Sequence, residues 1–312
     1  MRSSNRKFCM KNFLAITDLT TDELIQILDR ADQLREAWHS HAMPLTLRNQ
    51  RIALWFYGQG FRNRVAFEIG ARAMGADVAF VPGELGVHEP LQDIGRYLRN
   101  WFSMLIIRAR THADVLAVAH DAAIPTINAR TNHNHPCEIM GDLQYVRKVR
   151  GSLEGLTVVF VGEVTNLCMS WFEAAVRFSI SVVQVAPPHY LLPDNTLNEL
   201  RRHAVGKIST SSDLHHAISK KTEVIYTDCW PKGGDPERLK SLFLPYQITG
   251  EIVNRISDHG LFLPCPPVTR GQEVSEEAMR SEKCQDYAAK EYLLHAQNAI
   301  MEFLAHENAQ VT

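Results

Sequence analysis

The chain has 312 residues, of which 45% are hydrophobic and 22% charged, and its formal net charge is −2. This length exceeds what one hydrophobic core usually serves, so we expect two domains. A near-neutral charge without long runs of one sign argues against nucleic acid or a membrane surface as the main partner. With no stretch of about 18 apolar residues and no secretory leader, the sequence predicts a cytoplasmic protein.

The first predicted element is a helix that begins after Thr20. Thr20 and Glu23 have the spacing of a capping box, in which each side chain satisfies a backbone N–H group at the helix start. The apolar residues that follow recur at helical spacing and share one face: Leu24, Ile27, Leu28, Ala31 and Leu34.

Short apolar runs then alternate with helix-length segments. A first series of such runs comprises residues 52–57, 78–81, 104–107 and 124–128. After a polar, glycine-containing stretch at residues 150–156, a second series comprises residues 157–162, 182–186, 223–227 and 261–264. Runs that are apolar on both faces indicate buried parallel strands, which helices cover on both sides.

Two such series predict an α/β protein with two doubly wound parallel-sheet lobes and an interdomain cleft. We place the first domain at residues 1–150 and the second at residues 151–285. The last helix, residues 286–306, carries an apolar stripe that suits packing back onto the N-terminal lobe. In this fold class, ligands bind beyond the carboxyl ends of the strands.

A glycine-rich turn follows the first predicted strand. Gly58 and Gly60 lead into a helix that begins with Phe61, Arg62 and Asn63. Backbone N–H groups at a helix start, together with an arginine, suit an anion. A tight turn with two solvated arginines, Arg62 and Arg64, explains these residues equally well.

Arg108 directly follows an apolar strand. A charge at a buried strand end needs a partner. Anion binding and an ion pair with a residue such as Glu68 are the two interpretations, and we favour the first.

His135 lies where a strand end runs into a helix, just before Pro136. A helix N-terminus favours the neutral imidazole, which can donate a hydrogen bond to a polarised carbonyl group. A capping or packing role is the alternative.

Polar residues also follow the strands of the second lobe. Asn166 comes after the first strand, and Asp228 and Lys232 come after a later one. Asp228 could hold a substrate ammonium and Lys232 a carboxylate, while the Gly233-Gly234 pair makes this segment a candidate mobile lid. A flexible polar loop is the alternative.

The six cysteines form no CxxC pair and no Cys/His zinc pattern, so we interpret them as free thiols in a reducing compartment. Four of them lie at predicted strand ends: Cys137, Cys168, Cys229 and Cys265. A thiol nucleophile or a soft-metal cluster is conceivable there, but a small buried hydrophobe is the more common role of free cysteine. Cys265 and Pro266 lie in residues 263–267, a rigid segment at a strand end whose carbonyl groups would point into the cleft.

From Phe13 to Leu304, these segments resemble, in order, the aspartate/ornithine carbamoyltransferase family. The family's Ser-Thr-Arg-Thr-Arg phosphate loop falls on residues 60–64, the loop inserted by a neighbouring subunit on 85–93, the His-Pro-x-Gln motif on 135–138, the ornithine enzymes' Asp-x-Trp-x-Ser-Met-Gly loop on 228–234 and their His-Cys-Leu-Pro segment on 264–267. Residues 268–271, in contrast, are closer to the aspartate branch.

The sequence departs from these motifs at several positions. Gly60, Phe61 and Asn63 stand in the phosphate loop where the family has hydroxyl residues, Val87 stands for a lysine, Glu138 for the glutamine, Lys232-Gly233 for Ser-Met, Pro264 for a histidine and Leu293 for an arginine.

The resemblance implies a carbamoyltransferase-type enzyme without metal or organic cofactor. It would move a carbamoyl or related one-carbon group from a phosphorylated donor, such as carbamoyl phosphate, to the amine of an amino-acid-like acceptor. The implied catalytic residues are Arg62, Arg108 and His135; Gly60, Phe61, Asn63 and Glu138 complete the donor site, and Asn166, Asp228, Lys232, Cys265 and Pro266 form the acceptor site. It also implies a homotrimer with shared active sites.

The departures leave two alternatives open. Each hydrogen bond to phosphate that is lost costs about 1.5–3 kcal/mol, and Glu138 brings negative charge near a dianion unless it is protonated or paired. The scaffold could therefore use a changed donor in specialised biosynthesis, since Glu138 suits an amidine or ammonium. It could also be a catalytically silent homologue that serves as a binding or assembly partner.

Overall fold

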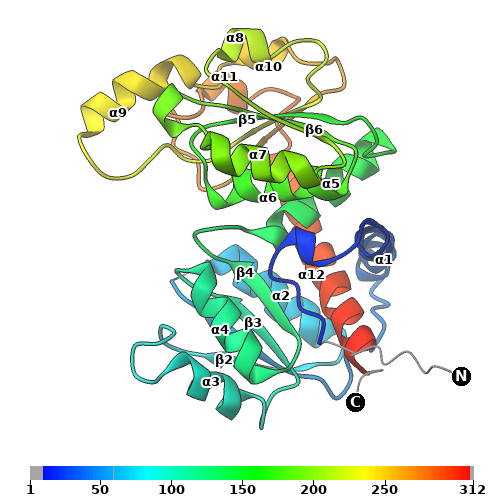
Figure 1. The fold of residues 1–312 in the computed structure, drawn as a ribbon. Helices are drawn as coiled ribbons and strands as arrows, with labels where there is room; N and C mark the ends of the chain where they lie inside the picture. The colour runs from blue at the N-terminus through cyan, green and yellow to red at the C-terminus, as the bar shows by residue number, and fades with distance from the viewer. Residues whose placement is uncertain (1–9, 59, 310–312) are drawn as a thin grey trace, which may run out of the picture. The chain divides into compact units, whose positions relative to one another are not determined.

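Strands and helices alternate along the chain in this computed structural model, which describes residues 10–58 and 60–309 (Figure 1). The described residues pack as two compact units. The first extends to Asn132 and resumes at Leu293, and the second comprises His133–Tyr292. Packing therefore groups helix α5 (Pro136–Arg150) with the second unit, although the sequence-based domain boundary was placed at its end.

The first unit contains a parallel sheet of strand order β2-β1-β3-β4. The strands are β1 (Arg51–Phe56), β2 (Asp77–Val81), β3 (Met104–Arg108) and β4 (Thr126–Arg130). They alternate with α1 (Thr21–His39), α2 (Phe61–Ala73), α3 (Leu91–Leu98) and α4 (His112–Ala122), after the short 3-10 turn η1 (Ile16–Asp18).

The central strands β1 and β3 are buried, as expected for strands that helices cover. The side chains of Ala53, Leu105 and Ile107 pack in one apolar cluster with residues of α3 and α4. Strand β4 begins at Thr126, two residues later than predicted, because Pro125 has no N–H group to donate to a strand ladder. β2 lies at the sheet edge and is largely exposed.

The second unit contains a parallel sheet of strand order β7-β6-β5-β8-β9. The strands are β5 (Thr157–Val161), β6 (Ser181–Val185), β7 (Lys207–Ser211), β8 (Val224–Thr227) and β9 (Leu261–Pro264). The remaining helical elements are α6 (Asn166–Arg177), η2 (Pro188–Tyr190), α7 (Asp194–His203), α8 (Leu214–Ala217), α9 (Pro236–Phe243), η3 (Leu244–Tyr246), α10 (Gly250–Asn254) and α11 (Glu276–Met279).

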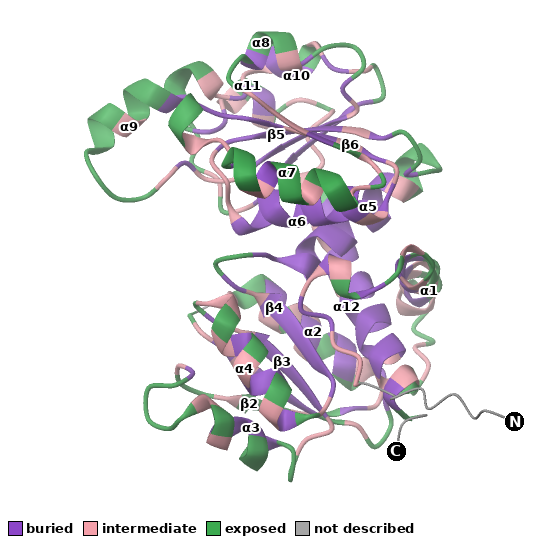
Figure 2. Cartoon of the chain, in the orientation of Figure 1, coloured by how far each residue is buried: buried purple, intermediate pink, exposed green. Residues whose placement is uncertain are grey.

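Helix α6 is the most buried element beside this sheet, whereas α7 and α9 present exposed residues (Figure 2). Trp171 of α6 lies edge-on against Tyr226 of β8, with ring centres 5.5 Å apart. Phe160 of β5 stacks on the same tyrosine at 5.7 Å. This aromatic packing fixes Tyr226 in the sheet interior.

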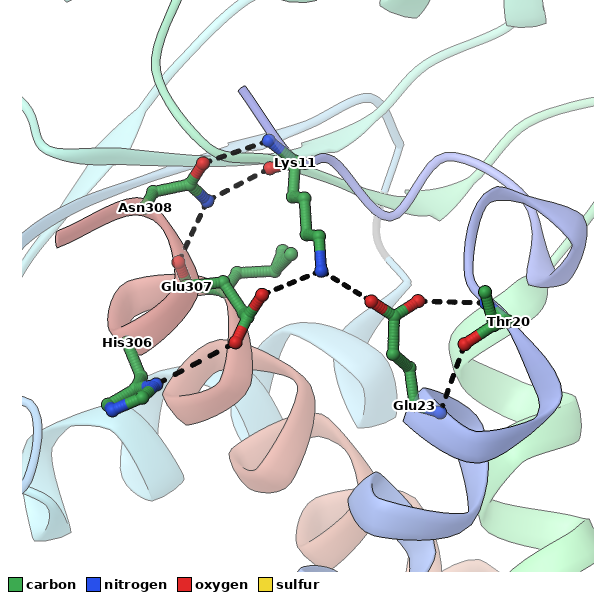
Figure 3. A network of polar contacts seen from close by, with 7 residues as sticks. Lys11, Thr20, Glu23, His306, Glu307 and Asn308 are labelled. Carbon is green, nitrogen blue, oxygen red and sulfur yellow. Dashed lines mark hydrogen bonds and ion pairs between the residues drawn. The ribbon is translucent and has the colours of Figure 1, made fainter. Parts of the chain in front are cut away.

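The C-terminal helix α12 (Asp286–Ala309) packs onto the first unit through its residues from Leu293 onward, as predicted. Arg30 of α1 makes hydrogen bonds of 2.6 and 2.9 Å to the carboxylate of Glu302. Lys11 forms ion pairs with Glu23 of α1 and Glu307 of α12 (Figure 3). The Asn308 side chain accepts a hydrogen bond from the backbone N–H of Lys11 at 2.8 Å and donates to its carbonyl oxygen at 3.1 Å.

In the part of the chain that the structure describes, every helix is too short or too polar to cross a lipid bilayer.

We predict that Asn308→Ala lowers the free energy of unfolding by about 1–3 kcal/mol, because it leaves both backbone groups of Lys11 without their partner. Asn198→Ala, at an exposed position of α7, is the matched control and should change stability by less than about 0.5 kcal/mol. Thermal and urea unfolding of both variants measures the difference. Equal stabilities of the two variants would contradict the role assigned to Asn308.

Candidate functional site

The start of helix α2 is shaped around Arg108. Gly60 is the N-cap residue and has left-handed backbone angles (φ 38°). A Cβ atom on residue 60 would lie 2.8–2.9 Å from three atoms of the Arg108 guanidinium group. The left-handed backbone favours glycine at this position, and the absence of a side chain lets the Arg108 guanidinium lie directly against the helix start. The first N–H groups of a helix are not used within the helix, so this place combines them with a cation.

Phe61 and Arg62 form an exposed pair at the first turn of α2. The Phe61 side chain is 60% exposed, and the Arg62 guanidinium carbon lies 4.9 Å from the centre of its ring. Arg64 is placed in the same way over Phe80, at 4.7 Å. In each pair the phenyl ring supports the arginine by a cation–π contact.

Asn63 is committed to the interior of the first unit. Its amide nitrogen donates to the carbonyl oxygen of Ala129 at 2.7 Å, and its amide oxygen accepts from Gln297 of α12 at 2.7 Å. The side chain is buried. Through these contacts Asn63 links α2 to β4 and α12. Because its side chain is used in this way, Asn63 would bind a donor through its backbone N–H group.

Sequence reasoning missed Arg110, which lies two residues beyond Arg108. Its guanidinium carbon is 4.0 Å from the centre of the Tyr57 ring, and it forms an ion pair with Glu84. The Trp55 indole N–H donates to the carbonyl oxygen of Gly83 at 2.9 Å. These contacts fasten the segment after β2 to the ends of β1 and β3. The sequence feature that could have pointed to Arg110 is its position close behind Arg108, as a second arginine at the same strand end.

In the second unit, His135 is the N-cap residue of α5, and Pro136 is its first helical residue. The His135 backbone N–H donates to the hydroxyl of Ser170 at 2.9 Å. Its Nε2 atom lies 3.5 Å from Oε2 of Glu138, one turn along the helix. Both side chains are buried. The structure thus brings together the two residues of the His-Pro-x-Glu segment that the sequence singled out.

Glu138 is neutralised by Lys290 of α12, which sequence reasoning also missed. The Lys290 Nζ atom lies 2.6 Å from Oε1 of Glu138 and 3.2 Å from Oδ1 of Asp142. Asp142 accepts a further hydrogen bond from the Tyr226 hydroxyl at 2.7 Å. Two acids four residues apart on a buried helix face need a cation, and Lys290 is the only lysine or arginine in α12.

Burial and charge set the protonation of this network. Burial raises the pKa of Asp142 to about 6, against the attraction of Lys290, and the charge of Glu138 adds to the rise. Burial would lower the pKa of Lys290, but Asp142 and Glu138 outweigh it, and the pKa stands well above its usual value. The lysine therefore stays charged at physiological pH.

A second acidic cluster lies at the carboxyl ends of β5 and β8. The Asp228 carboxylate accepts the backbone N–H of Cys229 at 2.8 Å. Burial raises the pKa of Glu163, and the charge of Asp228 raises it further. Burial and Asp228 also raise the pKa of Glu273, against backbone hydrogen bonds that lower it. This cluster suits a positively charged group, and sequence reasoning named only Asp228 of the three.

The other predicted acceptor residues differ in exposure. Lys232 is exposed and precedes Gly233 and Gly234, whose φ angles are 107° and 82°. Only glycine adopts such angles without strain. The buried Asn166 begins α6, next to the N-cap Thr165.

Cys265 is buried after β9, before Pro266, and its backbone N–H donates to Thr227 at 2.8 Å. Burial raises the pKa of this thiol well above its usual value, and it raises that of Cys229 to about 12, with Asp228 adding to the effect. Cys137 and Cys168 are also buried, with raised pKa values. Protonated thiols are poor nucleophiles, which favours a packing role for these cysteines.

Comparison with known proteins supports one family over nearly the whole chain. Residues 11–148 match the model of the carbamoyl-phosphate-binding domain of aspartate/ornithine carbamoyltransferases, and residues 154–304 match that of the aspartate/ornithine-binding domain. The chain is 33% identical to the ornithine carbamoyltransferase of Carboxydothermus hydrogenoformans, across 94% of this chain and 97% of that protein. It is 30% identical to that of Psychrobacter arcticus, across 97% and 99%.

Solved structures of ornithine carbamoyltransferases are similar to this chain over nearly its whole length. The ornithine carbamoyltransferase of Pyrococcus furiosus matches with a TM-score of 0.87 and 25% identity, over 94% of this chain and 96% of that one. The enzyme of Burkholderia thailandensis matches with a TM-score of 0.86 and 25% identity, over 94% and 98%.

We predict that Asp142→Asn changes the pH dependence of stability. The pKa of Asp142 is raised on folding, so the folded protein binds this proton more tightly, and the stability contributed by Asp142 falls as pH rises from about 4 to 6. The free energy of unfolding of the variant, relative to the wild type, should therefore rise over that interval. Asp77→Asn, at an exposed strand position, is the control and should run parallel to the wild type. A parallel curve for Asp142→Asn would contradict the assignment.

Proposed function

The chain belongs to the aspartate/ornithine carbamoyltransferase family, and on this premise we propose that it transfers a carbamoyl group from carbamoyl phosphate to the amine of an amino-acid-like acceptor. The observation that carries the proposal is the Arg108 guanidinium group lying against the start of α2 at Gly60. A cation beside free helix N–H groups is a site suited to phosphate.

In the proposed reaction, a neutral amine attacks the carbonyl carbon of the donor, a carbon–nitrogen bond forms, the carbon–oxygen bond to phosphate breaks, and the departing phosphate takes the proton that the amine loses. Arg62 and Arg108 would stabilise the charge that develops on the leaving phosphate. His135 would donate a hydrogen bond to the carbonyl oxygen as negative charge develops there. These roles come from the family resemblance, and the positions of the residues at strand ends and helix starts support them.

The pairing of Glu138 favours a carbamoyl donor over a cationic one. An unpaired carboxylate at this position would repel a phosphate dianion and attract an amidine. Lys290 removes that preference, since its ammonium lies 2.6 Å from Glu138. A carboxylate can still accept a hydrogen bond from the amino group of a carbamoyl donor.

For the acceptor, we propose that Asp228 binds its ammonium group and Lys232 its carboxylate, with Asn166, Cys265 and Pro266 lining the site. The acidic surroundings of Asp228 support an acceptor that carries positive charge. Because the relatives are named ornithine carbamoyltransferases, ornithine is the first acceptor to test.

A changed phosphorylated donor is the second candidate. It is favoured by the phosphate-loop segment, where the Asn63 side chain is used internally and Gly60 and Phe61 offer no hydroxyl group. Phosphate would then be held by arginines and backbone N–H groups alone.

We predict that Arg108→Ala weakens binding of carbamoyl phosphate at least about 100-fold, because hydrogen bonds to a charged group contribute about 1.5–3 kcal/mol each. Calorimetric titration with carbamoyl phosphate, and with inorganic phosphate as a second ligand, measures the change. Arg202→Ala, on the exposed face of α7, should bind like the wild type. Unchanged affinity in Arg108→Ala would reject the role given to this arginine.

We also propose a homotrimer with shared active sites, by family resemblance. Exposed apolar residues of the first unit support an interface. Val65 and Ile69 are each 42% exposed on one face of α2, in line with Phe61, and Phe80 of the edge strand β2 is 47% exposed. Such a cluster is typical of protein–protein contacts.

We predict that multi-angle light scattering gives the mass of three chains for the wild type, and that Ile69→Glu lowers it, because a charge would be buried in the interface. Leu116→Glu, at a 47% exposed position of α4, is the matched control and should remain trimeric. A monomeric wild type would remove this part of the proposal.

A further inference from the structure

A chain of buried polar contacts runs through the second unit, from His135 through Glu138 and Lys290 to Asp142 and Tyr226. We propose that Lys290 is a positioning residue: it holds Glu138 as a carboxylate, and Glu138 in turn fixes His135 as the tautomer that carries its proton on Nε2. The use of His135 in catalysis rests on the proposed function, whereas the effect of Lys290 on Glu138 and His135 does not.

The first step is the link between Lys290 and Glu138. A carboxylate removed from water favours its protonated form unless a cation lies close to it. The Lys290 ammonium provides that cation at 2.6 Å, and the Lys290 side chain is only 15% exposed. Because Lys290 sits on Oε1, Oε2 of Glu138 remains directed toward His135.

The second step is the link between Glu138 and His135. An ionised carboxylate can only accept hydrogen bonds, so the nitrogen that faces it is favoured as the protonated one. That nitrogen is Nε2. The separation of 3.5 Å is longer than a full hydrogen bond. Glu138 therefore fixes the orientation of the ring and favours the tautomer with the proton on Nε2.

The third step is the balance of charge. A carboxylate beside a histidine raises the pKa of the imidazole, and a nearby ammonium lowers it. Lys290 therefore opposes the effect of Glu138 and limits the protonation of His135. Without Lys290, Glu138 would be neutralised by a second proton on the His135 ring, and the ring would become a cation.

The other titratable groups around the network are Asp142 on α5, Tyr226 on β8, and Cys137 and Cys265. Burial raises the pKa of Tyr226 and of both thiols, so these groups stay protonated. Asp142, with a pKa of about 6, shares Lys290 with Glu138 and takes up a proton as the solution becomes acidic. A test of Lys290 should therefore be made above pH 6.5.

The test is nitrogen-15 NMR of the His135 ring in the full chain with labelled histidine, followed from pH 6.5 to 9. The signal is assigned by its loss in His135→Gln. We expect the neutral, Nε2-protonated pattern in the wild type and in Lys290→Arg. In Lys290→Met, the titration midpoint of His135 should rise by about one pH unit or more. In the double variant Glu138→Gln/Lys290→Met, this rise should disappear.

Lys148→Met, at an exposed position of the same helix α5, is the matched control and should leave the His135 signals unchanged. Identical His135 titrations in Lys290→Met and the wild type would overturn the proposal and leave Lys290 a purely structural role. If Lys290→Met does not fold, Glu138→Gln decides, because loss of the carboxylate should release a mixture of tautomers; an unchanged Nε2-protonated pattern would overturn the proposal.

The double variant removes both charges of the pair, and replacing a buried ion pair by uncharged residues of similar size is often tolerated. The NMR measurement needs no substrate. A failure of carbamoyl phosphate to bind would therefore count against the proposed function but not against the role of Lys290. An unchanged His135 titration in Lys290→Met would count against the role of Lys290 but not against the proposed function.

Discussion

Burying a polar or charged group is costly unless the group is paired, and in this chain helix α12 supplies partners to several such groups. Its early residue Lys290 neutralises the acids of α5, and its later residues Gln297, Glu302 and Asn308 satisfy groups of the first unit. Removing Lys290 or Gln297 would leave a buried charge or a buried hydrogen-bond acceptor unpaired, which is costly. The helix therefore holds in place elements that carry the proposed chemistry, including the start of α2 and the first turns of α5.

Two departures from the family motifs have a physical partner nearby. Gly60 stands where the resemblance implies a hydroxyl residue, and the space that a side chain would fill is taken by the guanidinium group of Arg108. Glu138 stands where the resemblance implies a glutamine, and Lys290 compensates its charge. Both changes alter how an anion would be held without adding net negative charge. They are consistent with a rebuilt donor site on a scaffold that the family shares.

The sequence predicted much of the fold because apolar periodicity reports burial directly. All five residues assigned to the inner face of α1 are buried, and the capping box of Thr20 is confirmed. The family assignment is also confirmed. Strand β7 was not predicted because it is a partly exposed edge strand of mostly polar residues, which lacks a continuous apolar run. Lys290 was missed because an ion pair between residues far apart in the chain leaves no local pattern in the sequence. The substrate roles of the site residues also depend on residues far apart in the chain, and they remain predictions.

The most direct test of the central claim is an assay of the wild-type protein with carbon-13-labelled carbamoyl phosphate and an amine, beginning with ornithine. Carbon-13 NMR follows the labelled carbonyl carbon, and released phosphate is measured in parallel. A carbamoyltransferase should release phosphate only when the acceptor amine is present and place the label on that amine in equal amount. Absence of both phosphate release and labelled product with every amine tried would contradict the account.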